Sequence, residues 1–117
     1  MSAFQIEKQE KQGIDVIHIS GFLDAHTAPE LEKEIENLIN LDKYKIIINL
    51  QKLDYISSAG LGVFMSHIEL IRNNGGDIKL CNLQEKVYSV FDLLGFPMLF
   101  DINNDENESI DKFLIEN

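Results

Sequence analysis

One short run of branched apolar residues constrains the fold of this chain more than any other feature. Lys45–Leu50 holds three consecutive isoleucines, and only Asn49 interrupts the apolar side chains that follow the lysine. A strand with one face in water alternates apolar and polar residues, whereas a strand covered on both faces has a nearly continuous apolar run. The run therefore predicts a central strand with other elements packed on both of its sides.

Two segments with helical spacing flank this strand. Their apolar residues recur every three or four positions, at Ala28, Leu31, Ile35, Leu38 and Ile39 in the first and at Leu61, Phe64, Met65, Ile68 and Ile71 in the second. We expect Thr27–Glu30 to start the first helix as a capping box, with Pro29 in the first turn, where a missing N–H is harmless. Asn73–Gly76 is typical of a helix end with a left-handed backbone conformation. Both segments are therefore predicted to be amphipathic helices.

Further strands are predicted on both sides of this helix-strand-helix unit. Phe4–Ile6 alternates, Val16–Ile19 is rich in branched residues, and a turn near Gln12–Gly13 joins them, which predicts a hairpin. Ile78–Cys81 alternates as another strand, and Met98–Phe100 is expected to form a short last strand.

Two more helices are expected in the second half of the chain. Val87–Leu94 has helical spacing and is stopped by a glycine and a proline. Ile110–Leu114 carries the apolar stripe of a C-terminal helix, capped by Ser109 or by an acidic residue just before it. The polar stretch Asn103–Glu108 is expected to be a flexible loop.

The order of these elements is β-β-α-β-α-β-α-β-α. Alternating strands and helices predict a largely parallel sheet with helices packed on it, and the hairpin adds an antiparallel strand. We therefore expect one α/β domain over residues 1–117, with a mixed, mostly parallel sheet of four to five strands and about four helices. A chain of 117 residues suffices for one such core and is too short for two ordinary domains.

Net charge narrows the range of partners. Twenty acidic against ten basic residues give a net charge of −10. Residues 24–42 and residues 101–117 each hold six acidic residues and one basic residue, and the charges of the remaining residues cancel. Phosphates of nucleic acids and anionic membranes repel such a chain, so we expect neither as a partner. The sequence shows no signal-peptide pattern and no apolar stretch of transmembrane length, so a cytoplasmic location is expected.

Sequence motifs for catalysis, cofactor binding and metal binding are not found. The chain has no P-loop, no complete dinucleotide-binding glycine pattern and no serine in a nucleophile elbow. His18, His26 and His67 have no second histidine and no cysteine two or four positions away, which disfavours a metal site. Cys81, the single cysteine, ends a predicted strand and is expected to be a core residue. We therefore expect no enzymatic activity, no cofactor and no metal.

Polar residues gather in two loops that follow neighbouring strands. In open α/β sheets the working residues lie in loops at the carboxyl ends of the strands, which here are Gly21–Thr27 and Leu50–Gly60. Asp24 either caps the following helix through an Asx turn or contributes to recognition of a partner. Ser57 and Ser58 precede a helix, where a serine either caps it or offers a hydroxyl at which a phosphate would be stabilised by the helix N-terminus.

The segment Leu53–Val63 resembles the signature of anti-sigma factor antagonists, the small members of the STAS domain family. Four further segments resemble landmarks of that family, namely Gly21–Asp24, Ile46–Leu50, Gly75–Cys81 and Val90–Phe96. The resemblance covers nearly the whole chain. It implies the same order of strands and helices that the hydrophobic pattern predicts.

This resemblance implies a regulatory mechanism called partner switching. An unphosphorylated antagonist binds an anti-sigma factor that is also a serine kinase, and so frees a sigma factor. The kinase uses ATP and Mg²⁺ to phosphorylate the antagonist at the start of its second helix, and a phosphoserine phosphatase reverses the reaction. The antagonist itself is a kinase substrate and a binding module.

The usual phosphoacceptor position of the family does not hold a serine here. Family members carry serine or threonine directly before the glycine of the motif, where this chain has Ala59. We take Ser58 as the first candidate for the phosphoacceptor and Ser57 as the second. Either Gly60 and Gly62 pack tightly against the sheet, or they let a partner's backbone approach. The expected partner-binding residues are Asp24, Ser57, Ser58, Ala59, Gly60, Leu61 and Gly62.

Other functions stay open at this point. A related domain could regulate a different output without a sigma factor, or could bind a nucleotide or a lipid. The chain has no lysine or arginine between Gly13 and Leu31, which makes an anionic ligand at the first loop less attractive. An enzyme is the least favoured class, since no motif for catalysis is found.

Overall fold

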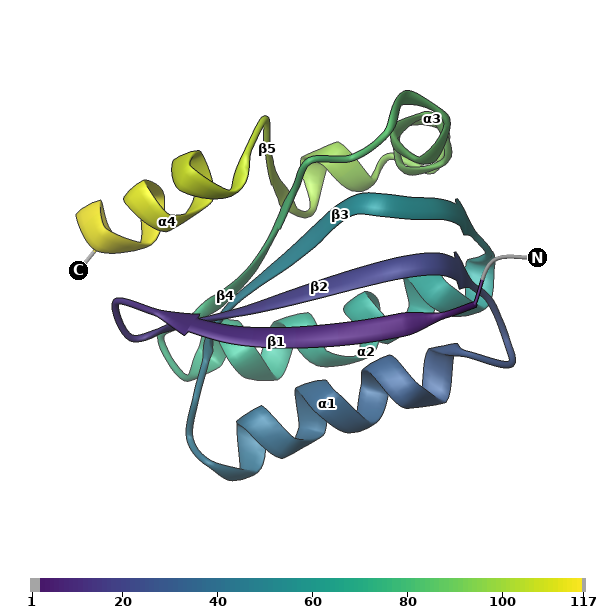
Figure 1. Cartoon of the computed structure of the whole chain (residues 1–117). Coiled ribbons are helices and arrows are strands. Elements are labelled where there is room, and N and C mark those ends of the chain that lie inside the picture. Colours follow the sequence, from purple (N-terminus) through teal and green to yellow (C-terminus); the bar gives the residue numbers. More distant parts are fainter. Residues whose placement is uncertain (1–2, 117) are drawn as a thin grey trace.

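The isoleucine run lies in the middle of a five-stranded sheet, as predicted. The computed structural model describes residues 3–116, and its strands follow one another across the sheet in sequence order (Figure 1). The first strand pairs antiparallel with the second, and all other neighbours are parallel. The strands are β1 (Gln5–Lys11), β2 (Ile14–Leu23), β3 (Lys45–Ile56), β4 (Asp77–Cys81) and β5 (Asp101–Asn103).

Helices lie on both sides of the sheet. They are α1 (Ala28–Asn40), α2 (Ser58–Asn73), α3 (Glu85–Leu93) and α4 (Glu106–Ile115), with a short 3-10 helix at Phe96–Met98. Figure 1 shows α1 and α2 on one side and α3 and α4 on the other. The predicted order β-β-α-β-α-β-α-β-α and the mixed α/β sheet are confirmed. Within residues 3–116, no helix combines the length and apolar character needed to cross a bilayer.

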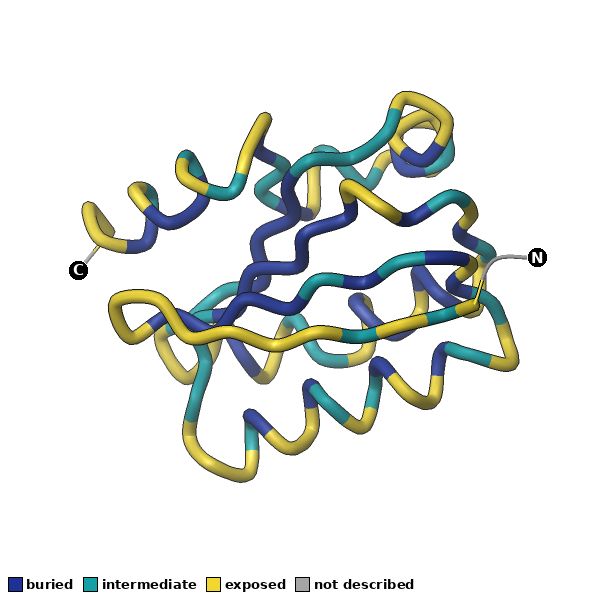
Figure 2. The backbone as a smooth tube through the Cα atoms, in the orientation of Figure 1, coloured by how far each residue is buried: buried dark blue, intermediate teal, exposed yellow. Residues whose placement is uncertain are grey.

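The central strand β3 serves both layers of the core. Ile46–Leu50 are all buried, which Figure 2 shows as the dark middle of the sheet. Ile46 and Ile48 pack in the main core with the apolar faces of α1 and α2, and Ile47 packs in a smaller cluster with α4. Successive side chains of a strand point to opposite faces, so an unbroken apolar run is what two covering layers require.

The edge strand β1 lies mostly in water. Six of its seven residues are exposed, and Ile6 alone is half-buried. The strand carries charges of both signs between Glu7 and Lys11. It is longer than the predicted Phe4–Ile6, because antiparallel pairing with β2 continues down to the turn at Gln12–Gly13. The predicted hairpin and its turn are confirmed.

The prediction of a strand at Met98–Phe100 is wrong. The chain forms a 3-10 helix at Phe96–Met98 instead, and the last strand, β5, begins only after Phe100. Phe100 is buried because its ring packs on those of Phe64 and Phe96, with centroids 6.2 and 5.6 Å away. Contacts between rings therefore account for the apolar character that suggested strand pairing.

The prediction of a flexible loop at Asn103–Glu108 is also wrong. Asn103 ends β5, and Asp105 caps α4 by accepting a hydrogen bond from the N–H of Glu108 at 2.8 Å. An acidic cap was one of the two predicted alternatives and is confirmed. Ser109, the other alternative, is buried inside the helix and donates its hydroxyl to Oδ1 of Asn103 at 2.6 Å.

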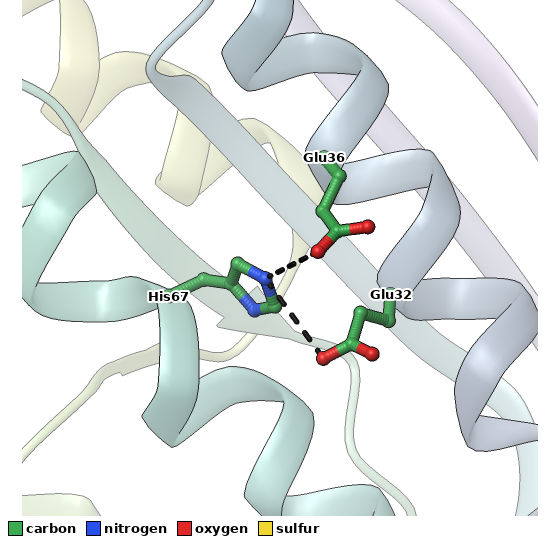
Figure 3. A group of neighbouring side chains, drawn as sticks. All are labelled: Glu32, Glu36 and His67. Carbon is green, nitrogen blue, oxygen red and sulfur yellow. Dashed lines mark ion pairs between the residues drawn. The ribbon is translucent and has the colours of Figure 1, made fainter.

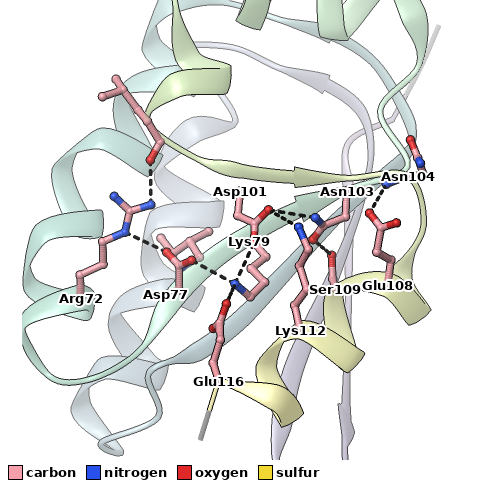
Figure 4. A network of polar contacts seen from close by, with 12 residues as sticks. Arg72, Asp77, Lys79, Asp101, Asn103, Asn104, Glu108, Ser109, Lys112 and Glu116 are labelled. Carbon is pink, nitrogen blue, oxygen red and sulfur yellow. Dashed lines mark hydrogen bonds and ion pairs between the residues drawn. The ribbon is translucent and has the colours of Figure 1, made fainter.

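A buried lysine joins β4, β5 and α4 (Figure 4). The side chain of Lys79 is 1% exposed, and its Nζ lies 2.9 Å from Asp101 and Glu116 and 3.3 Å from Asp77. Burial lowers the pKa of Lys79, but the bonds to Glu116 and Asp101 raise it by more, so the lysine stays charged. Lys112 contacts Asp101 as well, at 2.9 Å. Part of the C-terminal acidic block thus neutralises a charge inside the fold.

Candidate functional site

The carboxyl ends of β2 and β3 lie side by side, but the prediction of a loop at Leu50–Gly60 is wrong for most of that segment. Strand β3 continues to Ile56 and helix α2 begins at Ser58, so only Ser57 lies between them. Leu23 pairs with Ile56 where the two strands end, and the N–H of Ser57 donates to the carbonyl of Leu23 at 2.9 Å. This bond fixes the start of α2 beside the loop that leads into α1. The predicted proximity of the polar residues that follow these two strands is confirmed.

The two serines have different surroundings. Ser57 is half-buried and caps α2, with its Oγ accepting a hydrogen bond from the N–H of Gly60 at 3.4 Å. Ser58 is the first residue of the helix and is exposed. The first N–H groups of a helix have no acceptor within it, and they carry the positive end of the helix dipole. One serine thus supports the fold, while the other occupies an open position that favours anions.

The two glycines also differ. A Cβ at Gly60 would lie 2.8 Å from Cγ of Leu23 and 2.9 Å from the Leu23 carbonyl oxygen, so this position is set by tight packing of α2 on β2. A Cβ at Gly62 would meet nothing within 4 Å. The packing interpretation is therefore confirmed for Gly60 and wrong for Gly62. The missing side chain at Gly62 leaves the helix backbone open to solvent.

Asp24 organises the loop before α1. Its Oδ1 accepts hydrogen bonds from the N–H groups of His26 and Thr27 at 2.9 and 3.2 Å, which is the predicted Asx turn. These bonds, that of His26 foremost, lower the pKa of Asp24. The predicted capping box at Thr27 is wrong, because α1 has no side-chain cap. The Thr27 hydroxyl faces back into the loop, accepting from the N–H of Asp24 and donating to the carbonyl of Phe22.

The first turn of α2 is uncharged, and the surface beside it is partly apolar. The first turn of the helix holds no acidic residue. At the same edge of the sheet the rings of Phe22 and Tyr55 lie 5.5 Å apart, and both are about half exposed. Met65, one of the apolar residues with helical spacing in the predicted second helix, is exposed. A partner protein can cover the first turn of α2 without removing water from charged groups in that turn.

The candidate partner-binding residues divide by exposure. Gly60 and Leu61 are buried, Asp24 and Ser57 are half-buried, and Ser58, Ala59 and Gly62 are exposed. The last three form the part of the set that another protein can reach directly. Cys81 is buried, and burial raises the pKa of its thiol to about 12, so its predicted place in the core is confirmed.

One cluster of ligand-type side chains was not expected from the sequence. Glu32 and Glu36 of α1 lie opposite His67 of α2 (Figure 3). Spacing on one segment cannot find a ligand that another helix contributes. The sequence does indicate that Glu32 and Glu36 share one face of a helix, since they are four residues apart.

Known proteins with similar sequences belong to a family that has this fold. The STAS domain profile matches residues 5–109. The anti-sigma-B factor antagonist of Bacillus subtilis is 33% identical over 96 residues, which are 82% of this chain and 86% of that protein. The anti-sigma F factor antagonist of Paenibacillus polymyxa is 28% identical over 103 residues, which are 87% of this chain and 88% of that protein.

Solved structures share the architecture. A structure from Thermotoga maritima covers 92% of both chains with a TM-score of 0.86 at 21% identity. The phosphorylated form of SpoIIAA, a Bacillus cell fate determinant, covers 95% of this chain and 99% of its own with a TM-score of 0.70 at 26% identity. The fold, the order of its elements and the match over most of the sequence agree, and the chain belongs to the STAS domain family.

Proposed function

We propose that this chain is an anti-sigma factor antagonist that is switched by phosphorylation of Ser58. Its partner would be an anti-sigma factor with serine kinase activity, and a phosphoserine phosphatase would restore the unphosphorylated form. The unphosphorylated chain would bind this partner in the cytoplasm and free a sigma factor, acting as a binding module and not as an enzyme. The names of the two curated relatives support the first part of the proposal.

The exposed position of Ser58 at the start of α2 is the observation that carries the choice of phosphoacceptor. A kinase must reach the hydroxyl, and a phosphate needs room. Modification of Ser57 would instead disturb the cap of α2 and the backbone contact to Leu23. The existence of SpoIIAA in a phosphorylated form supports phosphorylation as the kind of modification involved.

The charge pattern supports a switch at this place. A phosphate adds about −1.5 to −2 charges at neutral pH. Among the aspartates, glutamates, lysines and arginines, only Glu69 and Arg72 lie between positions 57 and 76, and their charges cancel. An added dianion would therefore dominate the local field. A loss of about 2.8 kcal/mol of binding free energy would weaken the complex about a hundredfold.

The same modification should leave the fold intact. Anions near a helix N-terminus stabilise it by about 0.3–1 kcal/mol. Ser58 begins α2 but does not supply its cap, which comes from Ser57. Binding and folding would thus respond differently to charge at this position, and that difference makes the proposal testable.

The first experiment measures binding of candidate anti-sigma factor kinases to the wild type, Ser58→Ala and Ser58→Asp. Ser89→Asp on α3 is the matched control, because Ser89 is also an exposed helical serine. We expect Ser58→Ala to bind like the wild type. Ser58→Asp should bind at least about tenfold more weakly than Ser89→Asp, a loss of about 1.4 kcal/mol, with no loss of thermal stability. Equal binding by all variants would contradict Ser58 as the switch.

The second experiment maps the phosphorylated peptide after incubation with the bound kinase, ATP and Mg²⁺. Phosphate on Ser58 is expected, and phosphate on Ser57 would move the switch by one residue. Modification confined to Thr27 or Ser66 would contradict both candidates. Tight binding of ATP or GTP by the chain alone, measured by calorimetry, would favour the alternative of a nucleotide-binding module.

A further inference from the structure

Three side chains with metal-ligand chemistry converge between α1 and α2. Glu32 and Glu36 lie one turn apart on α1, and the Nε2 atom of His67 lies 3.9 and 3.7 Å from their respective Oε2 atoms (Figure 3). The three candidate ligand atoms all lie within 4.8 Å of one another. This cluster is separate from the start of α2, where the candidate phosphoacceptor lies.

The orientation of His67 presents the correct nitrogen to the carboxylates. Its Nδ1 lies 2.8 Å from the carbonyl oxygen of Val63. A carbonyl only accepts hydrogen bonds, so Nδ1 carries a proton, and in the neutral ring the lone pair is then on Nε2. Histidine ligands of metal ions are commonly fixed in this way, by a bond from the second ring nitrogen to a backbone carbonyl. The side chain is only 12% exposed, so packing between the helices also restrains the ring.

The two carboxylates lack a compensating cation. Carboxylates four residues apart on a helix repel each other. Within residues 3–116, His67 is the only ion-pair partner of Glu32 and Glu36, and both distances exceed that of a hydrogen bond. An imidazole carries at most one positive charge and so does not balance two negative charges. A dication placed between the three ligand atoms would do so.

We propose that Glu32, Glu36 and His67 form a binding site for a divalent transition-metal ion, with Zn²⁺ as the best match. One imidazole nitrogen and two carboxylate oxygens are ligands that zinc accepts, and three protein ligands leave a fourth position for water. Tetrahedral zinc holds its ligand atoms about 3.4 Å apart. The two glutamate side chains are 42% and 58% exposed, and so are free to move towards Nε2 of His67 by a few tenths of an ångström and towards each other. The ion would tie α1 to α2.

Magnesium and calcium fit the site less well. Both prefer sets of six or more oxygen ligands, whereas here one of the three protein ligands is nitrogen. The proposal therefore predicts selectivity for Zn²⁺ over Mg²⁺ and Ca²⁺. It does not depend on Ser58 or on any partner protein.

The test titrates the full chain with ZnCl₂ by calorimetry and follows thermal unfolding with and without the metal. Zn²⁺ should bind one site per chain and raise the melting temperature, while Mg²⁺ and Ca²⁺ at the same concentration should not. Removing even an outer partner of a metal ligand commonly weakens binding 10–100-fold, so Glu36→Gln and His67→Gln should each weaken Zn²⁺ binding more than about tenfold. The imidazole nitrogen signals of His67 in NMR spectra should shift on binding.

Two control variants distinguish binding of Zn²⁺ at this site from non-specific binding elsewhere on the surface. His26→Gln removes an exposed histidine in a loop, and Glu69→Gln removes an exposed carboxylate on α2. Both should bind Zn²⁺ like the wild type. No binding by the wild type, or equal binding by Glu36→Gln, His67→Gln and the controls, would overturn the proposal. If His67→Gln unfolds, Glu36→Gln still decides the outcome, since the side chain of Glu36 is more than half exposed.

Discussion

The start of α2 and the lysine network of β4, β5 and α4 use charge in opposite ways. At the start of α2 the exposed residues Ser58, Ala59 and Gly62 are uncharged, and the helix begins with free N–H groups. Around Lys79 every charge has an opposite charge within 3.3 Å. The fold thus neutralises the charge of the buried Lys79, on which its stability depends. The exposed residues at the start of α2 are left uncharged, so the local field there is sensitive to a single added charge.

The largest effect is expected from breaking the network with Lys79→Met. Three carboxylates would lose their shared cation, and removal of one member of a buried ion pair costs about 3–5 kcal/mol. Asp77 and Asp101 keep Arg72 and Lys112 as partners, so we expect a loss at the lower end of this range, about 3 kcal/mol. Urea unfolding of the variant should show this loss of free energy. Lys86→Met removes a cation from an exposed pair with Asp54, and should change stability by less than about 1 kcal/mol. Equal effects of the two substitutions would remove the basis of the comparison.

At the start of α2, a substantial loss of stability is expected from Gly60→Ala. The new methyl group would meet Leu23 at 2.8–2.9 Å, and one of the blocking atoms belongs to the backbone. Overpacking of this kind costs about 3 kcal/mol at the upper end of its usual range. Gly62→Ala is the matched control, because space is open there and alanine favours the helix by about 0.5–1 kcal/mol. Thermal unfolding of both variants checks the prediction, and equal destabilisation would contradict it.

A smaller loss of stability is expected at low pH, where Asp101 becomes protonated. Burial raises the pKa of Asp101, but hydrogen bonds from Lys112 and Lys79 lower it by more, to about 2 from an ordinary value of 3.8. Since the folded pKa lies below the unfolded one, the stabilisation is fully present above about pH 4 and is lost as the pH falls towards 2. It amounts to about 2 kcal/mol.

Unfolding free energies measured between pH 5 and pH 2 check this prediction. Asp101→Asn should flatten the pH dependence in that window, and the exposed Asp92→Asn should leave it unchanged. A wild-type slope that survives in Asp101→Asn would assign the acid sensitivity to other carboxylates.

The smallest effect distinguishes the two serines. Ser57→Ala removes the cap of α2 and should cost about 1 kcal/mol, towards the low end of the range for caps because the bond to Gly60 is 3.4 Å long. Ser58→Ala should change stability by less than about 0.5 kcal/mol. Chemical denaturation resolves the difference. A larger loss for Ser58→Ala would reverse the roles that the structure gives the two residues.

The regular strands and helices were predictable because their buried residues recur along the sequence with a fixed spacing. The run at Lys45–Leu50 and the stripes of α1 and α2 repeat with the geometry of a covered strand and of half-buried helices. The region after α3 has no such period. Phe100 is apolar because it packs on other rings, and Asp105 is polar because it caps a helix, so both were misread as belonging to other kinds of structure.

The site was predictable where the interactions are local. The cap at Ser57 and the Asx turn at Asp24 involve residues two or three positions away, so residue type and position suffice to propose them. The difference between Gly60 and Gly62, the burial of Lys79 and the side chains opposite His67 depend on contacts between distant segments. No local pattern encodes such contacts.

The edge strand β1 has a consequence for the behaviour of the protein at high concentration. Its outer side leaves backbone N–H and C=O groups without a neighbouring strand, which is the usual starting point for strand addition and fibril growth. Glu7, Lys8, Glu10 and Lys11 stand exposed along this strand. Charged side chains at a sheet edge, lysines above all, discourage a second chain from extending the sheet. A strand without a buried residue therefore helps to protect its edge of the sheet against aggregation.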